Sequence, residues 1–135
     1  MALGAALLVA LAACVVPPPA PDEAAAPPGA PSRVLDLRSF RVELRQNETF
    51  EVRLPGNPTT GYRWVLVDPV PPFVLVRGVA RFEPDAPGLM GSPGQERWEM
   101  SAIGAGEGPL QFEYRRAGDS ASPPAQRVTY RLVVR

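Results

Sequence analysis

The chain offers few side chains that could carry catalysis or hold a metal. It contains no His and a single Cys, Cys14, which excludes His-based triads, His metal sites and an intramolecular disulfide. The acidic candidates in loops are Glu83, Asp85 and Asp119. No motif brings two of them together, as glycosidic or Ca²⁺ chemistry would require. We therefore predict that the protein is not an enzyme and that it uses no metal and no cofactor.

Charge and size narrow the class of protein further. The 135 residues include 14 basic and 14 acidic side chains, so the formal net charge is zero. A nucleic-acid binder needs a basic excess to release counterions, and we expect no nucleic-acid partner. The length fits one domain, and 18 Pro and 12 Gly indicate a turn-rich chain. These features favour a small binding or structural module, which we expect to be a monomer.

The single Cys directly follows an apolar segment, residues 1–13, that has no charged side chain. That segment is short for a membrane-spanning helix but has the length of a signal-peptide apolar region. The residues Leu11-Ala12-Ala13-Cys14 resemble a bacterial lipobox, which implies cleavage before Cys14 and a diacylglycerol group on its thioether. The resemblance implies a lipid-anchored protein of the bacterial cell envelope, with the outer membrane favoured because Val15 is not acidic. The alternative is a buried apolar helix with a chance Cys.

Residues 14–32 are rich in Pro and Ala. Proline disfavours helix and sheet, so we predict polyproline II or disorder for this segment. Fully extended, such a tether would reach on the order of 55 Å. The predicted organisation is a signal peptide (1–13), a tether (14–32) and one folded domain (33–135).

The most distinctive segment of that domain is Gly56-Asn57-Pro58-Thr59-Thr60-Gly61-Tyr62. Asn57 precedes Pro58 and should be extended, while Gly61 can adopt a positive φ without steric cost. The two β-branched Thr are restricted at χ1. We predict a stiff, projecting turn with two hydroxyl groups near its tip, suited to recognition because a stiff loop loses little entropy on binding. The alternative is an ordinary connection between two strands.

Two further loops could belong to the same surface. Residues 83–94 form a long loop that contains the apolar pair Leu89 and Met90. Exposed, this pair would mark a contact surface; folded back, it would cap the core, and the sequence leaves both possibilities open. Residues 116–125 are small and polar, and by themselves they are typical of a solvated hairpin connection.

The elements that must position these loops are strands. Apolar and polar residues alternate around Phe40, Phe50, Trp98, Phe112 and Tyr130, which places one face of each strand in a core and the other in water. Tyr62 to Val67 is nearly all apolar, and we predict a central strand covered on both sides. About seven strands in about 100 residues predict an all-β, antiparallel β-sandwich. Its core should be filled by Phe40, Phe50, Trp64, Trp98, Phe112 and Tyr130.

The residues Asn57 to Tyr62, followed by Trp64, resemble the signature loop of the chagasin-type inhibitors of papain-like cysteine peptidases. All six positions of Asn-Pro-Thr-Thr-Gly-[Tyr/Phe] match. The family's second loop carries Gly-x-Gly-Gly, matched in part by this chain, so the candidate second loop is Leu89, Met90, Gly91, Ser92, Pro93 and Gly94. Its third loop carries Arg-Pro-Trp, which falls on Arg116, Ala117 and Gly118, where only the Arg is kept.

The resemblance implies an immunoglobulin-like sandwich with three loops at one end that blocks papain-like (clan CA) proteases. Thr59 and Thr60 would enter the protease cleft, and the missing third-loop Trp implies weaker or narrower inhibition than is usual in the family. An alternative is a non-inhibitory immunoglobulin-like envelope lipoprotein that acts in adhesion or assembly.

Overall fold

A computed structural model describes residues 31–135. The predicted signal peptide (1–13), the predicted lipidation site Cys14 and all but the last two residues of the predicted tether (14–32) lie outside the described residues. Between residues 31 and 135, no helix has the length and apolar character needed to cross a membrane.

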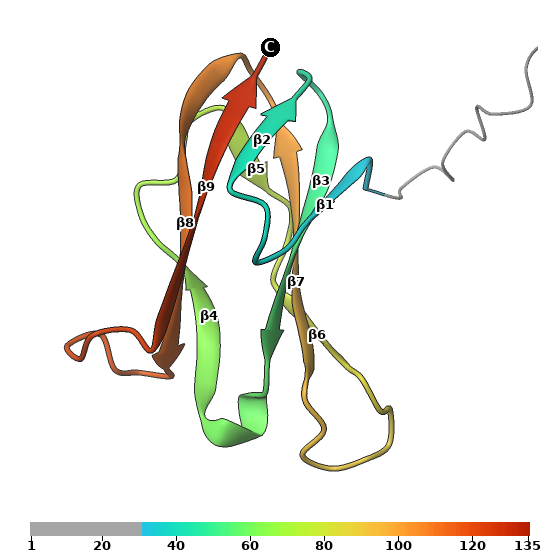
Figure 1. The fold of residues 1–135 in the computed structure, drawn as a ribbon, viewed down its shortest axis with the longest axis vertical. Helices are drawn as coiled ribbons and strands as arrows, with labels where there is room; N and C mark the ends of the chain where they lie inside the picture. The colour runs from blue at the N-terminus through green and yellow to red at the C-terminus, as the bar shows by residue number, and fades with distance from the viewer. Residues whose placement is uncertain (1–30) are drawn as a thin grey trace, which may run out of the picture.

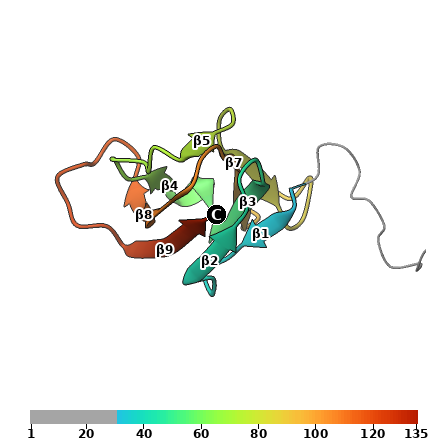
Figure 2. The same ribbon diagram turned by 90° about the horizontal axis from the view of Figure 1, so that it is seen from above.

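Two sheets pack face to face in the described domain (Figures 1 and 2). One contains β1 (Arg33–Leu35), β3 (Thr49–Gly56), β7 (Gly94–Ala102) and β5 (Val74–Val76), with β6 (Arg81–Pro84) also paired to β7. The other has the order β2 (Arg41–Leu44), β9 (Gln126–Val134), β8 (Gly106–Arg116) and β4 (Tyr62–Leu66). A single turn of 3-10 helix, η1 (Pro58–Thr60), joins β3 to β4 and so crosses from one sheet to the other. The predicted all-β sandwich is confirmed.

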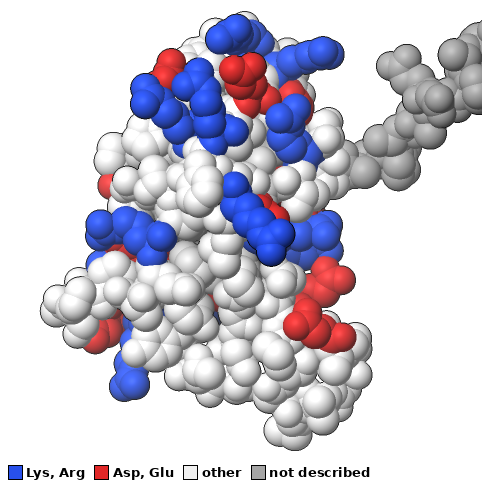
Figure 3. All heavy atoms as spheres, in the orientation of Figure 1, with Lys and Arg blue, Asp and Glu red and all other residues white. Residues whose placement is uncertain are grey.

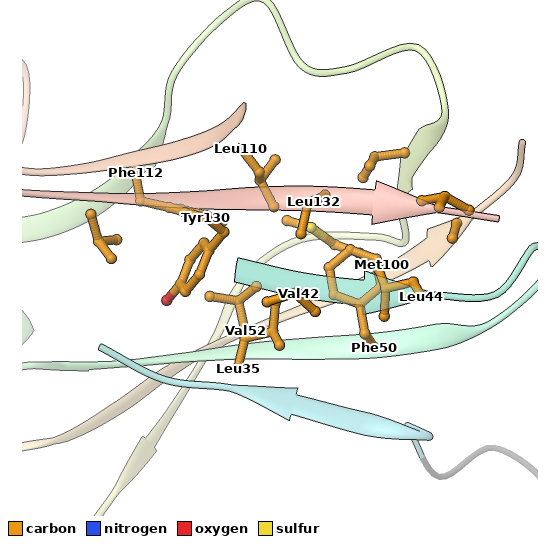
Figure 4. Packing of buried hydrophobic residues seen from close by; sticks show 14 of the residues in the cluster. Leu35, Val42, Leu44, Phe50, Val52, Met100, Leu110, Phe112, Tyr130 and Leu132 are labelled. Atoms are coloured by element: carbon orange, nitrogen blue, oxygen red, sulfur yellow. The ribbon is translucent and has the colours of Figure 1, made fainter. Parts of the chain in front are cut away.

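The core lies between the sheets and is filled by the inward residues of the alternating pattern. Phe50, Phe112 and Tyr130 are almost fully buried, and Figure 4 shows Tyr130 and Leu132 facing residues such as Val52 across the interior. Trp64 is buried, and Trp98 is half-buried with its ring edge-on to Phe112, at 5.4 Å between centroids. Strand alternation thus predicted most of the aromatic core correctly.

The prediction that Phe40 belongs to the core is wrong. Phe40 is 71% exposed, although it shares the parity of the buried Val42 and Leu44. It precedes β2, an edge strand, and follows a turn in which the Ser39 N–H donates to the Asp36 carbonyl. Phe40 lies just before the strand begins, so the alternation that buries Val42 and Leu44 does not extend to it.

The strand pairing also differs from the prediction. There are nine strands in the described domain rather than about seven, and two pairs are parallel, β1 with β3 and β2 with β9. Both parallel pairs involve short strands near the start of the domain, where the chain passes from β1 in one sheet to β2 in the other and back to β3.

The segment that begins at Tyr62 was predicted as a central strand and is instead an edge strand. β4 pairs only with β8, and Val65 is 46% exposed. This position at the edge leaves the outer N–H groups of β4 free for other partners, which matters for the loop that precedes the strand.

Each sheet has one buried carboxylate that pairs with arginines of its own strand and of the neighbouring strand. Glu51 accepts hydrogen bonds from Arg53 and from Arg97, the latter at 2.7 Å. Burial raises the pKa of Glu51, but these hydrogen bonds outweigh it and leave the pKa below its usual value. Glu113 on the other sheet pairs with Arg115 and Arg127, whose hydrogen bonds lower its pKa.

Candidate functional site

The first loop has the backbone that its residue types predict. Asn57 is extended (φ −145°, ψ 100°), as expected before Pro58, and Gly61 is left-handed (φ 81°). Between them Pro58–Thr60 forms the single 3-10 turn, closed by the Thr60 and Gly61 N–H groups on the Asn57 and Pro58 carbonyls at 3.1 and 3.0 Å. The loop is therefore a closed turn rather than an extended segment.

Side-chain hydrogen bonds stiffen this turn. The Asn57 Oδ1 accepts from the Thr59 N–H at 3.1 Å and from the Thr59 hydroxyl at 2.6 Å. The Thr60 hydroxyl donates to the Asn57 carbonyl at 2.7 Å. Both Thr residues are exposed, as predicted, but each hydroxyl already has a partner within the loop. Their main effect in the free protein is to hold the tip in one shape.

Aromatic residues support the base of the first loop. Tyr62, which is half-buried, lies 5.5 Å from Tyr114 between ring centroids, and Trp64 lies 5.1 Å from Tyr114. The Tyr114 hydroxyl accepts from the Asn57 N–H at 3.3 Å, and the Trp64 Nε1 donates to the Pro55 carbonyl at 2.9 Å. The loop's two ends are thereby bonded to both sheets.

A buried carboxylate lies behind the same loop. Glu96 on β7 is 3% exposed, and its Oε1 accepts from the Trp64 N–H at 3.2 Å, on the open edge of β4. A Cβ placed on Gly56 would lie 3.4 Å from that oxygen, so a larger residue at 56 would crowd it. Burial raises the pKa of Glu96, and the Trp64 hydrogen bond and the nearby Arg63 oppose that shift.

The second loop, between β6 and β7, exposes its apolar pair. Leu89 is 66% and Met90 96% exposed, so neither folds back onto the core, which resolves the alternative that the sequence left open. Ser92 is the buried residue of this loop: its hydroxyl accepts from the Ala86 N–H at 3.1 Å and donates to the Pro93 carbonyl at 2.9 Å. Gly94 begins β7, where any Cβ would collide with the main chain of Glu83.

The third loop, between β8 and β9, is held by its own hydrogen bonds. Asp119 accepts from the N–H groups of Ala121 and Ser122 at 3.1 and 3.0 Å, and the Arg115 guanidinium donates to the Ser122 carbonyl. Arg116 ends β8, and its guanidinium lies 5.6 Å from the centre of the Tyr62 ring. Ala117 and Gly118 follow, both exposed, and Gly118 has a φ of 79°. The loop is an organised turn despite its lack of an aromatic anchor.

The three loops lie at the same end of the sandwich, the lower end in Figure 1. The first is bonded to both of the others: the Asn57 Nδ2 donates to the Gly91 carbonyl at 3.1 Å, and the Ala117 N–H donates to the Gly61 carbonyl at 2.8 Å. These bonds join residues that are far apart in sequence into one surface. Sequence reasoning placed the loops together only through the family resemblance, and the structure places them together by direct contact.

Sequence reasoning missed two residues that support this surface, Glu96 and Tyr114. Glu96 was detectable in principle, because the alternation of Trp98, Met100 and Ala102 on β7 continues backward to position 96 and places its carboxylate inside. Alternation gives Tyr114 an inward face, and nothing in the sequence indicated that its hydroxyl meets the Asn57 N–H.

The surface formed by the loops carries little charge. Figure 3 shows charged side chains over the upper part of the molecule and mostly uncharged atoms over the lower end. Residues 56–62 contain no charged side chain, and residues 85–93 contain only Asp85. Within residues 31–135, no three His, Cys, Asp or Glu residues come close enough to hold a metal ion. The first and second loops therefore present a largely uncharged surface, and the third adds Arg116 and Asp119.

Comparison with known proteins assigns this arrangement to a family. The family model described as "Chagasin family peptidase inhibitor I42" matches residues 43–134, more than half of the chain. The chain belongs to the chagasin family of peptidase inhibitors. It is an inhibitor, and the prediction that it is not an enzyme is confirmed by this membership.

Individual relatives agree with the family. The chain is 27% identical over 94 residues to Amoebiasin-2 of Entamoeba histolytica, covering 70% of this chain and 76% of that protein. Its fold is similar to that of the cysteine protease inhibitor EhICP2 from Entamoeba histolytica, with a TM-score of 0.64 at 21% identity over 78% of this chain and 100% of that one. It is also similar to PbICP-C, solved in complex with falcipain-2, with a TM-score of 0.54 at 21% identity over 77% of this chain and 100% of that one.

Proposed function

We propose that this chagasin-family inhibitor blocks papain-like (clan CA) cysteine peptidases by placing the first loop, residues 57–61, in the active-site cleft. The observation that carries the proposal is that this exposed turn is hydrogen-bonded to both neighbouring loops, through Asn57–Gly91 and Gly61–Ala117. A surface of this kind enters a cleft with its shape already set. The complex of PbICP-C with falcipain-2 supports a cysteine protease as the partner.

The hydrogen bonding of the loop explains why it would block a protease without being cleaved. The carbonyls of Asn57, Pro58 and Gly61 already accept bonds from Thr60, Gly61 and Ala117. A scissile peptide must lie extended with its carbonyl directed at the catalytic groups, and a closed 3-10 turn does not offer that geometry. The Thr59–Thr60 tip would fill the cleft while the second and third loops contact its two walls.

The expected strength of inhibition follows from what the loops contain. A stable interface buries about 800 Å² per partner, and its energy is concentrated in a few anchors, often Trp, Tyr or Arg. Ala117 and Gly118 stand where the family has Pro-Trp, so one aromatic anchor is absent. The exposed Leu89 and Met90 offer apolar contact area on the opposite flank. We expect weaker inhibition than is usual for the family.

We also propose that the protein is anchored in the bacterial envelope through lipid on Cys14, with the outer membrane favoured. The place where the chain enters the domain, at Ser32, is consistent with this. The Ser32 N–H donates to the Thr49 carbonyl at 2.9 Å, and Thr49 begins β3 whereas Gly56, next to the first loop, ends it. The eight residues of β3 separate these points by roughly 23 Å. A tether ending at Ser32 would leave the inhibitory end directed away from the membrane.

The proposal is tested by titrating papain with the full chain and with the double variant Thr59→Ala/Thr60→Ala. The double variant removes both intraloop hydroxyl bonds, and we expect inhibition at least tenfold weaker. Thr129→Ala, which changes an exposed Thr on the face of β9, is the matched control and should inhibit like the unchanged chain. If the unchanged chain does not inhibit papain or related proteases at tens of micromolar, the family fold serves the alternative, a non-inhibitory role in adhesion or envelope assembly.

A further inference from the structure

We propose that Met90 is an oxidation-sensitive contact residue, and that conversion of its thioether to the sulfoxide by a hydroperoxide weakens the grip of the inhibitor on its protease. The inference rests on the proposed function, because it requires the second loop to contact a target. It adds a modification site and a means of regulation to that function.

Exposure singles out Met90. It is 96% exposed, whereas Met100, the other methionine among residues 31–135, is 0% exposed within the core. Oxidation of methionine follows exposure. A peroxide therefore reaches the Met90 sulfur in the folded domain and leaves Met100 unchanged, so the fold should survive the reaction.

The local backbone keeps Met90 in this position. Gly88 and Gly91 on either side have φ values of 86° and 78°, and the Leu89 and Ser92 N–H groups donate to the Ala86 and Leu89 carbonyls. The buried Ser92 closes the base of the loop. With the backbone turned in this way, Leu89 and Met90 project into solvent as a pair.

The neighbouring contact places Met90 beside the first loop. Gly91, the next residue, accepts the hydrogen bond from the Asn57 side chain that joins the second loop to the first. A cleft that receives Thr59 and Thr60 therefore has the Met90 side chain beside its rim. A contiguous exposed apolar pair on a surface with few charged side chains indicates a contact with another protein.

The chemistry is a balanced two-electron oxidation. The sulfur attacks the outer, hydroxyl oxygen of the hydroperoxide, an S–O bond forms and the O–O bond breaks with its electron pair on the inner oxygen. That oxygen takes up the proton of the transferred hydroxyl and leaves as water or an alcohol. The flexible apolar thioether becomes a polar sulfoxide whose oxygen needs hydrogen-bond donors. Because burying a polar group without a partner is unfavourable, we expect inhibition to weaken about tenfold to a hundredfold.

The experiment treats the full chain with hydrogen peroxide, removes the peroxide with catalase, maps the added oxygen by peptide mass spectrometry and measures inhibition of thiol-reduced papain. Met90→Leu keeps the apolar surface without sulfur, and we expect it to inhibit like the unoxidised chain before and after treatment. Met90→Gln imitates the polarity of the sulfoxide and should be weak throughout. Methionine sulfoxide reductases A and B together should restore the oxidised chain.

The outcomes separate the two proposals. An untreated chain that fails to inhibit any papain-like protease overturns the proposed function. An untreated chain that inhibits, and that inhibits equally well with its Met90 fully oxidised, overturns the inference and leaves the proposed function standing. Equal loss in the oxidised Met90→Leu variant also overturns it, because a group other than Met90 is then responsible for the effect.

Discussion

The side-chain amide of Asn57 donates to the main-chain carbonyl of Gly91 at 3.1 Å, across 34 residues of sequence. Its oxygen meanwhile accepts from the Thr59 N–H and hydroxyl. One side chain therefore shapes the first loop with its oxygen and fixes the position of that loop against the second with its nitrogen. The two roles can be separated by a change of a single atom.

Asn57→Asp makes that change. The Asp keeps the oxygen that caps the turn but replaces the donor with a second acceptor, which faces the Gly91 carbonyl. We expect inhibition of papain to weaken about tenfold, because the second loop is no longer held against the first and must be ordered when the inhibitor binds. The melting temperature should fall only slightly, because the site is exposed and the cap is kept.

The matched control for that variant is Asn47→Asp. Asn47 lies in the β2–β3 turn at the other end of β3, with a positive φ of 65° that Asp also tolerates. It should leave inhibition unchanged. Equal inhibition by the two Asp variants would show that the bond to Gly91 has no part in the interface.

Gly61→Ala tests the left-handed residue that ends the first loop. No atom lies within 4 Å of the added Cβ, so the penalty is conformational and of roughly 1–2 kcal/mol. Gly78→Ala is the control, with a similar φ of 75° and equally open surroundings in the β5–β6 connection. Urea denaturation should show similar losses of stability for both variants. Inhibition should weaken only for Gly61→Ala, since the strain there distorts the loop itself.

The sequence predicted the parts of this structure that depend on local chemistry. Pro58 after Asn57 and the Gly at 61 were sufficient to predict the extended and left-handed conformations that the structure shows. Alternation gave the inward faces of β3, β8 and β9, because a strand with one buried face must alternate. The exposure of Met90 and Leu89, by contrast, depends on how the loop folds around Ser92, and their apolar character alone could not decide it.

The sequence-based predictions that were wrong concern where a strand begins and which strands face or pair with each other. Phe40 has an inward parity, but parity does not reveal where the strand begins. The parallel pairing of β1 with β3 and of β2 with β9 involves strands of three and four residues, whose partners no local pattern specifies. The hydrogen bonds from Asn57 to Gly91 and from Ala117 to Gly61 join residues far apart in sequence, and they follow from the sandwich as a whole.

Introducing the family's Pro-Trp at positions 117 and 118 of the third loop should not strengthen inhibition. The Ala117 N–H donates to the Gly61 carbonyl at 2.8 Å, and a proline has no N–H to replace it. Gly118 has a φ of 79°, which strains a Trp. We expect Ala117→Pro to weaken inhibition severalfold, with Ala117→Ser, which keeps the N–H, as the control. Stronger inhibition by Ala117→Pro/Gly118→Trp would show that the Ala117–Gly61 bond is not needed to hold the inhibitory surface together.

Glu96 makes the stability of the domain depend on pH. Burial raises its pKa above the unfolded value, so the folded state binds the proton more tightly than the unfolded chain does. The stabilisation that this tighter proton binding gives the folded state is fully present below the unfolded pKa and is lost as pH rises through the folded pKa. Glu96→Gln cannot ionise and keeps an oxygen for the Trp64 N–H. We expect it to be more stable than the unchanged chain at neutral pH by about 1 kcal/mol, with the gain disappearing in acid.

Urea denaturation between about pH 4 and 8, a range chosen to cover the titration of a glutamate side chain, measures the difference in unfolding free energy between Glu96→Gln and the unchanged chain. Glu99→Gln removes an exposed carboxylate from the same strand and should reproduce the pH dependence of the unchanged chain. Glu96→Leu removes the acceptor as well as the charge. Because the Trp64 N–H then loses its partner behind the first loop, this variant should inhibit papain less well than Glu96→Gln. A Leu variant that inhibits as well as the Gln variant would show that the Glu96–Trp64 bond does not position the loop.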